Sequence, residues 1–466
     1  MNNLSVQSIL EEISKRCIPT LDEVHEITEC ATKVKQMIES FVVEHKLKGI
    51  VKEIVYGGSF AKGTWLKNET DIDVFIKFYD SIDYDQFEKC GKQIGMLALQ
   101  EFSPYLRYAD HPYVEAIVEG IKVNIVPCYD VPFGEWKSAA DRSPYHTNYI
   151  VNKLDPEQKN EVRILKKFMK SIKIYGAEIS TEGFSGYVCE VLILKFGSFL
   201  STIHFFSECS SKKIMIGIDG SLTPTGEHFD RFDSFIVILD PIDTNRNLGS
   251  AISIRAASTL IQGSRKFLCN PSDKYFVSEI EHPIDPCFMD QLSSFILIIK
   301  FHYADRPSDV IWGQLKKLVK SIVKFSESCG FTILKSECSV VQEEKNCIIA
   351  LLLESTVISP LFLKKGPEIF RGTDLKKFLE VNNASLLKWL DNSSKTNCLL
   401  LRKHTNIQEY LRFVLNSNPG LIGIPKGIKS DFLKSYAIFT LSQIENFDTH
   451  IKNAVSELLY TDDRVF

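Results

Sequence analysis

The pattern of hydrophobic and polar positions at the start of the chain predicts two helices and then two strands. Apolar residues recur at helical spacing over residues 5–47, with a break at Pro19 and with Thr20 as the cap of the second helix. The segment VKEIVYGG at 51–58 has the pattern of a short strand that ends in a Gly-rich turn, and DIDVFIKF at 71–78 that of a second strand. We therefore expect the chain to begin with a module that mixes helices and strands.

A hairpin and a helical region follow this module's first strands. The runs YVEAIV and IKVNIVPCY flank the turn Glu119-Gly120, an arrangement typical of a β-hairpin. Residues 158–202 have helical spacing and include the basic stretch RILKKFMKSIKIYG. A turn-rich zone around 217–230 then leads to the strand FIVILDP and the segment IDTNRNL. We expect the first module to end near residue 150, before the helical region.

The C-terminal part of the chain alternates strand-like and helical runs. FILIIKF and CIIALLLES are strand-like, whereas WGQLKKLVKSIVKF is helical, and this order is typical of an α+β sandwich of the ferredoxin or RNA-recognition type. The sequence thus predicts an α+β multidomain protein. We expect a mixed α/β domain at 1–150, a helical or mixed central domain at 151–274 and an α+β domain at 275–466.

Composition and charge exclude few functions. The chain of 466 residues is 44% hydrophobic and 24% charged, and its formal net charge of −4 still allows a local basic face that binds RNA. None of the 12 cysteines stands in a CxxC motif, so no zinc site is predicted. The apolar runs are far shorter than a membrane span, and the first residues lack a signal core. We therefore expect a cytoplasmic protein without a membrane partner.

The candidate chemistry lies in the segment GGSFAKGTW and in the strand that follows it. Strand alternation puts Asp71, Asp73 and Phe75 on one face of this strand. Two neighbouring carboxylates repel each other unless a cation lies between them, and a hard divalent ion, typically Mg²⁺, is the usual one. The upstream turn at Gly58-Ser59 offers backbone N–H groups and a hydroxyl to a triphosphate. A phosphate site beside paired carboxylates indicates in-line nucleotidyl transfer assisted by two metal ions.

Each of these two motifs has an ordinary explanation on its own. GGS is often a plain turn, and a DxD pair on a strand is often a solvated edge. Together, at this spacing and before an apolar strand, they form the signature of the nucleotidyltransferase superfamily. We therefore expect the mixed sheet with helices of that superfamily in the first domain.

Further segments of the sequence point to one family within this superfamily. In chain order, the sequence contains RYADHPYVEAIVEGIKVNIVPCY, SAADRSPYHTNYI, NEVRILKKFMKSIKIYGAE, GFSGYVCEVLI and DPIDTNRNL. This series resembles the class I, or archaeal-type, CCA-adding enzymes, which are tRNA nucleotidyltransferases, across the first two predicted domains. The last third of the chain is a weaker match, although GPEIF and the order of strands and helices agree.

The resemblance implies a set of residues that hold the nucleoside triphosphate. They are Gly58, Ser59, Lys62, Ser143, His146, Lys166 and Tyr175. Lys62 stands where most family members have Arg. It keeps the positive charge but lacks the guanidinium group that binds phosphate through two hydrogen bonds. Ser143 stands where Thr is usual in the family. Independently of the resemblance, helical spacing predicts a cationic face, for which a plain solvated surface is the alternative. Its members are Arg163, Lys166, Lys167 and Lys170.

Arg246, in DPIDTNRNL, resembles the arginine that selects the incoming base. Cytosine N3 and adenine N1 accept hydrogen bonds, whereas uracil N3 and guanine N1 carry protons that would oppose an arginine donor. An ordinary ion pair of Arg246 with Asp243 or Asp240 is the alternative. Tyr113, in HPYV, resembles a residue near the nucleotide and the primer end, and a buried strand tyrosine is equally compatible with the local sequence.

Asn124 departs from the family pattern. The strand IKVNIV is expected to supply a third carboxylate, and alternation puts Lys122, Asn124 and Val126 on one face, so an amide occupies the expected place. An amide oxygen can coordinate Mg²⁺ but adds no negative charge, and the loss of rate is expected to be on the order of 10²–10³-fold or more. Two explanations stay open: an Asp→Asn change made to inactivate the protein, or a natural loss of activity with retention of RNA binding.

The expected function is template-independent addition of CCA to the 3′ end of tRNA from CTP and ATP, with release of pyrophosphate. Asp71, Asp73 and Asn124 are the expected catalytic and metal-binding residues, with Mg²⁺ as the cofactor. The expected partners are tRNA lacking CCA and the two nucleotides, with a homodimer as one assembly open to the chain. The alternatives are a catalytically silent protein that binds tRNA ends and a nucleotidyltransferase of the oligoadenylate type.

Overall fold

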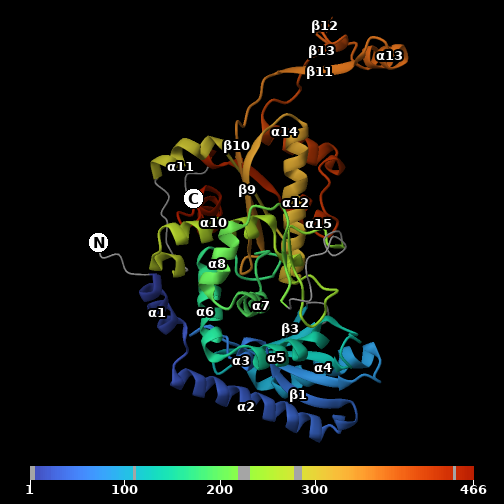
Figure 1. Ribbon diagram of the computed structural model, residues 1–466. Coiled ribbons are helices and arrows are strands. Elements are labelled where there is room, and N and C mark those ends of the chain that lie inside the picture. Colours follow the sequence, from blue (N-terminus) through green and yellow to red (C-terminus); the bar gives the residue numbers. More distant parts are fainter. Residues whose placement is uncertain (1–5, 109–111, 219–230, 278–285, 444–447) are drawn as a thin grey trace. The chain divides into compact units, whose positions relative to one another are not determined.

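The computed structural model describes residues 6–108, 112–218, 231–277, 286–443 and 448–466 (Figure 1). Its contacts divide the chain into two compact units: the first is Met1–Ile280 with Thr461–Phe466, and the second is Glu281–Tyr460. Each unit contains its own clusters of buried hydrophobic residues. The division into three domains that the sequence predicts stays a prediction.

A five-stranded mixed sheet forms the N-terminal part of the first unit. Its strands lie in the order β1 (Val51–Gly57), β2 (Asp71–Tyr79), β5 (Ile121–Asp130), β4 (Pro112–Val118) and β3 (Tyr105–Tyr108). Strands β2 and β5 are parallel, and the other neighbours are antiparallel. Ile72, Val74 and Ile76 alternate along β2 and are fully buried, as the pattern predicts. The other face of β2 therefore carries Asp71 and Asp73.

Two helices complete the core of this sheet. Helices α2 (Leu21–Glu44) and α4 (Tyr84–Ala98) contribute buried residues to the same cluster as the strands. The hydroxyl of Thr20 caps α2, because it accepts a hydrogen bond from the backbone N–H of Glu23 at 3.2 Å. The preceding helix, α1 (Val6–Cys17), packs instead in the cluster of the helical part of this unit. The predicted pair of N-terminal helices is confirmed.

The hairpin between β4 and β5 forms at the predicted turn. Glu119 and Gly120 both have positive φ, 53° and 83°, which is the conformation of a type I′ turn and matches the twist of the strands. The turn sets the pairing register, so that Val118 lies opposite Ile121 and Glu115 opposite Asn124. This register determines which side chains of β5 share a face with β2.

The central part of the first unit is mainly helical. Its elements are α5 (Arg142–Lys153), α6 (Pro156–Ser171), α7 (Gly186–Phe196), α8 (Phe199–Glu208), β6 (Ile214–Ile216), β7 (Ile236–Ile238) and α10 (Ile254–Cys269). The helical run expected over 158–202 is interrupted between α6 and α7, where the N–H of Phe184 donates a hydrogen bond to Ile174 O at 2.8 Å. Gly183 permits this approach, because an added Cβ would lie 2.1 Å from Ile174 O. The prediction of helix is wrong for this segment.

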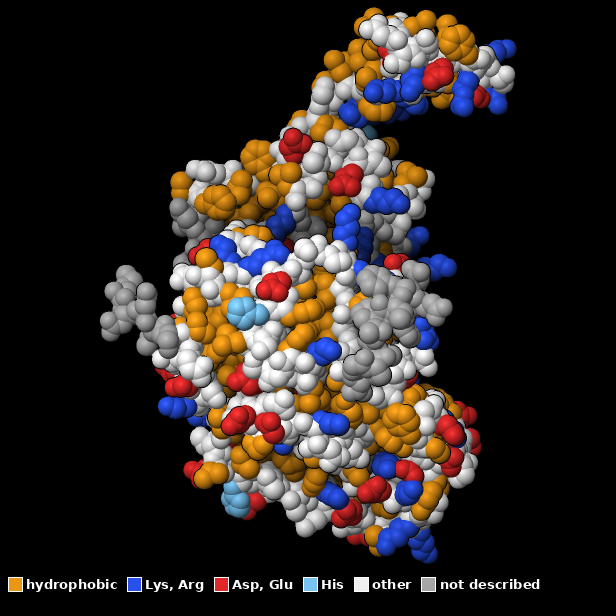
Figure 2. Space-filling model, in the orientation of Figure 1, with side chains coloured by type: hydrophobic (Ala, Val, Ile, Leu, Met, Phe, Trp, Pro, Cys, Tyr) orange, Lys and Arg blue, Asp and Glu red, His pale blue; other side chains and the backbone are white. Residues whose placement is uncertain are grey.

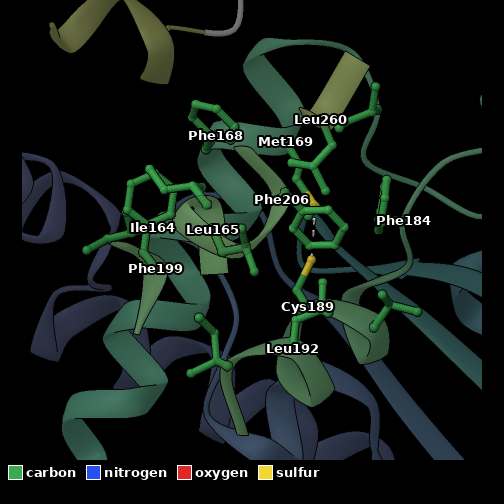
Figure 3. Packing of buried hydrophobic residues seen from close by; sticks show 14 of the residues in the cluster. Ile164, Leu165, Phe168, Met169, Phe184, Cys189, Leu192, Phe199, Phe206 and Leu260 are labelled. Atoms are coloured by element: carbon green, nitrogen blue, oxygen red, sulfur yellow. Dashed lines mark hydrogen bonds between the residues drawn. The ribbon is translucent and has the colours of Figure 1, made fainter. Parts of the chain in front are cut away.

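Aromatic side chains fill the core of the helical part (Figure 3). Phe168, Phe184, Phe199 and Phe206 are fully buried, and the rings of Phe168 and Phe199 pack edge to face with centroids 5.4 Å apart. Edge-to-face contact aligns the positive rim of one ring with the negative face of the other. The predicted strand FIVILDP is confirmed by β7, whereas residues 219–230 of the turn-rich zone lie outside the described residues.

Within the described ranges, no single helix has the length and apolar composition needed to cross a membrane. Helices α7 and α8 together meet that test of length and composition, but they are bent by 90° at their junction. Their side chains Val191, Leu192 and Ile203 are fully buried in the core of the unit.

The second unit contains a four-stranded antiparallel sheet. Its order is β14 (Ala437–Thr440), β8 (Ile296–His302), β10 (Asn346–Leu353) and β9 (Ile333–Val341), and its two main helices are α12 (Ser308–Ser328) and α14 (Ile407–Ser417). Along the chain the elements follow the order strand, helix, strand, strand, helix, strand. With the first and third strands in the middle, this is the ferredoxin-like arrangement. The predicted fold of the C-terminal part is confirmed.

Between β10 and α14, the chain forms a separate three-stranded sheet with one helix. It consists of β11 (Leu361–Glu368), α13 (Gly372–Val381), β12 (Leu387–Leu390) and β13 (Lys395–Leu401). Many of its side chains are exposed, and Figure 2 shows hydrophobic and basic side chains next to one another over this segment. Among the described residues of the unit, further α-helices are α11 (Pro286–Leu292), α15 (Lys429–Ser435) and α16 (Thr449–Leu459).

Candidate active site

The two predicted carboxylates lie together at the start of β2. Strand β2 pairs in parallel with β5, so that Asp71 lies opposite Lys122 and Asp73 opposite Asn124. Asp71 is about half exposed, with 46% of its side-chain surface accessible, whereas the Asp73 carboxylate lies deeper in the protein. Burial, together with the nearby charge of Asp71, raises the pKa of Asp73, although a hydrogen bond from Asn124 opposes the shift. The expected carboxylate pair is therefore present on one face of the sheet.

The glycine turn lies directly against Asp73. The turn leads from β1 into α3 (Gly58–Lys62), and Gly58 has a positive φ of 62°. A Cβ added to Gly58 would lie 1.8 Å from Asp73 Oδ2, and one added to Gly57 would lie 2.3 Å from the ring of Phe75. Only glycine fits both the conformation and the space. The Gly58 backbone therefore lies directly beside one acid of the carboxylate pair, whereas its role in binding phosphate stays a prediction.

Asn124 holds Asp73 through its amide. Its Nδ2 donates a hydrogen bond to Asp73 Oδ1 at 2.9 Å, whereas its Oδ1 is buried and has no hydrogen-bond partner. A buried amide oxygen without a hydrogen-bond partner, on the side chain that contacts Asp73, is of the ligand type that a hard divalent cation prefers. Across the described part of the chain, no group of three or more His, Cys, Asp or Glu side chains is placed to hold a metal ion. The site therefore offers two carboxylates and one amide oxygen.

Lys122 also belongs to this site, and its contact with Asp71 was not predicted from the sequence. Its Nζ lies 2.5 Å from Asp71 Oδ2. Partial burial disfavours the ammonium, but the hydrogen bond to Asp71 and the neighbouring carboxylates outweigh it and raise the pKa of Lys122. Strand alternation predicts that Lys122 shares a face with Asn124. The sequence does not show that β5 pairs in parallel with β2, and this pairing is what brings Lys122 to Asp71.

A buried ionic cluster lies beside the turn. Lys62 Nζ donates to Glu190 Oε2 at 2.8 Å, and Thr64 Oγ1 donates to Glu190 Oε1 at 2.5 Å. Lys166 Nζ donates to Thr64 O at 2.9 Å and lies 3.8 Å from Glu190 Oε1. Burial opposes the ionised form of Glu190, but the two lysines outweigh it and lower the pKa of its carboxyl group. The cluster brings together Lys62 and Lys166, which are separated by more than 100 residues.

Glu190 and Tyr187 were not among the predicted site residues. Both lie on α7, within the quoted segment GFSGYVCEVLI, where a lone acid among apolar residues was the available signal. Lys62 Nζ lies 4.8 Å from the centroid of the Tyr187 ring, and His146 stacks on the same ring with centroids 4.1 Å apart. Tyr187 therefore connects the lysine cluster with His146.

Asp240 joins two of the predicted residues. Its Oδ2 lies 2.9 Å from His146 Nε2 and 3.4 Å from an Arg246 guanidinium nitrogen. Burial lowers the pKa of His146 even though Asp240 favours its protonated form. Of the two acids considered for Arg246, the partner is Asp240, since Asp243 accepts a hydrogen bond from Arg142 at 2.9 Å. The Arg246 side chain remains 44% exposed, so part of its fork is accessible to a ligand.

The other predicted residues occupy the surroundings of these groups. Ser143 lies in the first turns of α5, three residues before His146. A Cβ added to Gly186 would lie 2.9 Å from the Tyr175 hydroxyl and 3.5 Å from Lys166 Nζ, so the tyrosine and the lysine meet at the start of α7. Tyr113 lies on β4 two residues before Glu115, the register partner of Asn124, and thus on the face that bears the acids.

The four cations expected to form one face of α6 are divided between buried and partly exposed positions, so a plain solvated surface does not describe them. Arg163 and Lys166 are buried, and Arg163 donates to the backbone oxygens of Trp65 and Gly63 at 2.8 and 2.7 Å. Both Lys167 and Lys170 pair with Glu69. The helix uses these cations to bind the segment after the turn, which the helical spacing alone could not indicate.

Comparison with known proteins identifies the class of this site. Family models match three consecutive parts of the chain: a nucleotidyltransferase domain at 34–153, the second domain of tRNA nucleotidyltransferases at 160–277 and the C-terminal domain of CCA-adding enzymes at 293–440. The mixed sheet, the glycine turn and the paired acids lie within the first match. The fold and the site thus define a nucleotidyltransferase.

Full-length relatives identify the family. The CCA-adding enzyme of Pyrobaculum islandicum is 32% identical over 436 residues, which cover 90% of this chain and 96% of that protein. That of Methanocaldococcus jannaschii is 31% identical over 429 residues, covering 91% and 94%. Among solved structures, that of E. coli MS115-1 CdnC with ATP aligns with 59% of this chain and 96% of its own, at 17% identity and a TM-score of 0.44. This chain belongs to the archaeal-type CCA-adding enzymes.

Proposed function

We propose that this protein adds CCA to the 3′ end of tRNA from CTP and ATP, without a template and with release of pyrophosphate. The observation that carries the proposal is the contact between the Gly58 turn and Asp73, with Asp71 on the same strand face. This contact brings a phosphate-binding backbone and a cation-binding acid pair together in a chain that matches CCA-adding enzymes over nine-tenths of its length.

A divalent cation, for which we propose Mg²⁺, fits the residues present. Asp71, Asp73 and the buried, unpartnered Oδ1 of Asn124 would hold it. When bound, such a cation favours deprotonation of the RNA 3′-hydroxyl and neutralises charge on the triphosphate. The amide of Asn124 brings less negative charge than a carboxylate, so the site has reduced capacity to promote the reaction.

The triphosphate is held by the turn and by the lysine cluster. Lys62, Lys166 and Glu190 carry a formal net charge of +1 in a buried setting, where an unbalanced cation is costly and attracts an anion. The backbone of Gly58 and the hydroxyl of Ser59 lie at the start of the helix that carries Lys62. Phosphate oxygens can therefore receive both backbone hydrogen bonds and positive charge at this position.

The incoming base is selected by Arg246. Its guanidinium is fixed on one side by the fully buried Asp240 and is partly exposed on the other. The exposed donors suit cytosine N3 and adenine N1, which are acceptors, and oppose the protonated N3 of uracil and N1 of guanine. His146, kept neutral by burial, contacts the same carboxylate oxygen and helps to orient it.

Incorporation of labelled nucleotides into tRNA that ends at the discriminator base tests this proposal. We expect transfer from CTP and ATP, rejection of UTP and GTP, and a loss of about 100-fold or more in Asp73→Asn. The matched control is Asp130→Asn, at the far end of β5, which removes a carboxylate bound by Lys52 and Lys77 and should retain the rate. Equal rates for Asp73→Asn and the unchanged protein would refute the proposed site.

A catalytically silent protein that binds tRNA ends is the second candidate, because Asn124 adds no negative charge beside Asp73 and the Lys122 ammonium offsets the charge of Asp71. Binding of truncated tRNA without incorporation of any nucleotide would establish it. Polymerisation of ATP in the absence of tRNA would instead indicate an activity of the oligoadenylate type.

A further inference from the structure

Strand β5 supplies a donor to each acid of the site. Lys122 Nζ lies 2.5 Å from Asp71 Oδ2, and Asn124 Nδ2 lies 2.9 Å from Asp73 Oδ1. The parallel register produces both contacts, since Asp71 faces Lys122 and Asp73 faces Asn124 across the two strands. Each carboxylate is thus already neutralised or hydrogen-bonded by the chain itself.

The charges of these four groups do not suit two divalent cations. Asp71 and Asp73 provide two negative charges, Asn124 provides none, and Lys122 adds one positive charge in contact with Asp71. Lys122 also interacts electrostatically with Asp73, so its charge acts on both acids. Counting the protein groups alone, two divalent ions would place four further positive charges beside this ammonium, and repulsion between like charges at such distances is strong where the surroundings are partly buried.

We propose that Lys122 takes the place of one of two divalent cations, so that this site binds a single divalent cation together with the nucleoside triphosphate. The inference rests on the proposed function, because it concerns the same acid pair. The Lys122 ammonium supplies part of the positive charge that a second cation would bring, and it is fixed to the chain. The uncharged amide of Asn124 is consistent with this, because a site that binds one divalent cation instead of two needs less negative charge from the protein.

The rest of β5 offers a matched comparison. At the other end of the strand, Asp130 pairs with Lys52 and Lys77, far along the strand from the acid pair. Lys52 and Lys122 have similar side-chain exposure, 47% and 39%. Replacing either lysine with methionine keeps most of the side-chain volume and removes one positive charge from the same sheet. Only Lys122→Met is expected to affect cations at the acid pair.

Counting bound Mn²⁺ by electron paramagnetic resonance tests the inference without catalysis. With CTP fully bound and no RNA present, we expect one Mn²⁺ per protein–CTP complex. Lys122→Met combined with Asn124→Asp should bind two. Without nucleotide, Lys122→Met alone should bind Mn²⁺ about tenfold more tightly than the unchanged protein, as expected when a like charge is removed from a partly buried site. Lys52→Met should match the unchanged protein in both measurements.

Two results would overturn the inference: two Mn²⁺ ions bound to the unchanged protein with CTP, or a Lys122→Met affinity within twofold of the unchanged protein. Neither result depends on transfer to RNA. Failure of the proposed function would appear separately, as absence of nucleotide incorporation into truncated tRNA even after Asn124→Asp, whatever the number of bound ions. Thermal unfolding of each variant verifies that the fold is kept.

Discussion

Lys62 Nζ and Glu190 Oε2 lie 2.8 Å apart in a buried ion pair that joins the end of α3 to α7. The side chains are 8% and 1% exposed, so water contributes little to either charge. Because the same carboxylate also accepts from Thr64 and lies near Lys166, the removal of its charge leaves two buried lysines without their common acid. The ion pair therefore has consequences for stability and for nucleotide binding.

We expect Glu190→Gln to lower the free energy of unfolding by about 3 kcal/mol or more, the usual cost of breaking a buried ion pair by changing one partner. The matched control is Glu69→Gln, since Glu69 also serves two lysines, Lys167 and Lys170, but is partly exposed. Its loss should cost about 1 kcal/mol or less. Urea unfolding of both variants measures the difference, and equal costs would contradict the importance of burial.

Asn124→Asp should raise the rate of CMP and AMP incorporation on the order of 10²-fold or more, because it restores a negative charge beside Asp73. The measurement is single-turnover incorporation into tRNA lacking CCA. The control is Val126→Asp, which adds a negative charge to the same face of β5 two positions further along the strand. It separates the effect of an added charge from the effect of a carboxylate at position 124. An unchanged rate for Asn124→Asp would show that this position is not the missing ligand.

Gly58→Ala should reduce incorporation by about 100-fold or more, because the new methyl group would collide with Asp73 Oδ2 and displace an electrostatic catalytic group. Gly120→Ala is the control: its φ is also positive, 83°, but an added Cβ would meet no atom within 4 Å. It should cost only about 1 kcal/mol of stability, the conformational cost of that backbone region, and retain the rate. Similar rates for the two variants would exclude a tight contact at Asp73.

Arg246→Ala should weaken the discrimination between CTP and UTP by roughly 10- to 100-fold, the effect of losing about 1–3 kcal/mol of base-directed hydrogen bonding. Because Arg246 is held by Asp240, Asp240→Asn should produce a smaller change in the same direction. Arg231→Ala, which removes a nearby guanidinium bound to Asn245, should leave discrimination unchanged. Competition between labelled CTP and UTP measures the ratio, and an unchanged ratio in Arg246→Ala would assign the arginine to the ion pair alone.

The burial of His146 predicts a pH dependence of stability. Its pKa lies below the ordinary value of 6.5 in the folded protein, so as the pH falls below that value the unfolded chain takes up a proton that the folded chain does not. Protonation therefore favours the unfolded state, and the free energy of unfolding should decrease from pH 7 towards pH 5.5. His146→Gln should flatten this decrease, as measured by urea unfolding across the range. An identical slope in the variant would contradict a neutral buried imidazole.

The sequence by itself determined the local elements and the family. Period-two alternation identified the face of Asp71 and Asp73, and the same rule put Asn124 and Lys122 on one face of their strand. The paired glycines predicted a tight turn, and the structure adds the reason for them, because Phe75 and Asp73 fill the space that side chains would need. These features depend on neighbouring residues, so their patterns are visible along the chain.

Tertiary structure decided which distant groups meet. Glu190 contacts Lys62 from 128 positions away, and His146 contacts Asp240 across 94. Helical spacing on α6 indicated a cationic face, but it does not reveal the acids and backbone oxygens that receive those cations. The contact of Lys122 with Asp71 depends on two strands from separate segments pairing in one register. Periodicity reports the direction of a side chain from its own element, whereas its partner is set by how elements far apart in the chain pack.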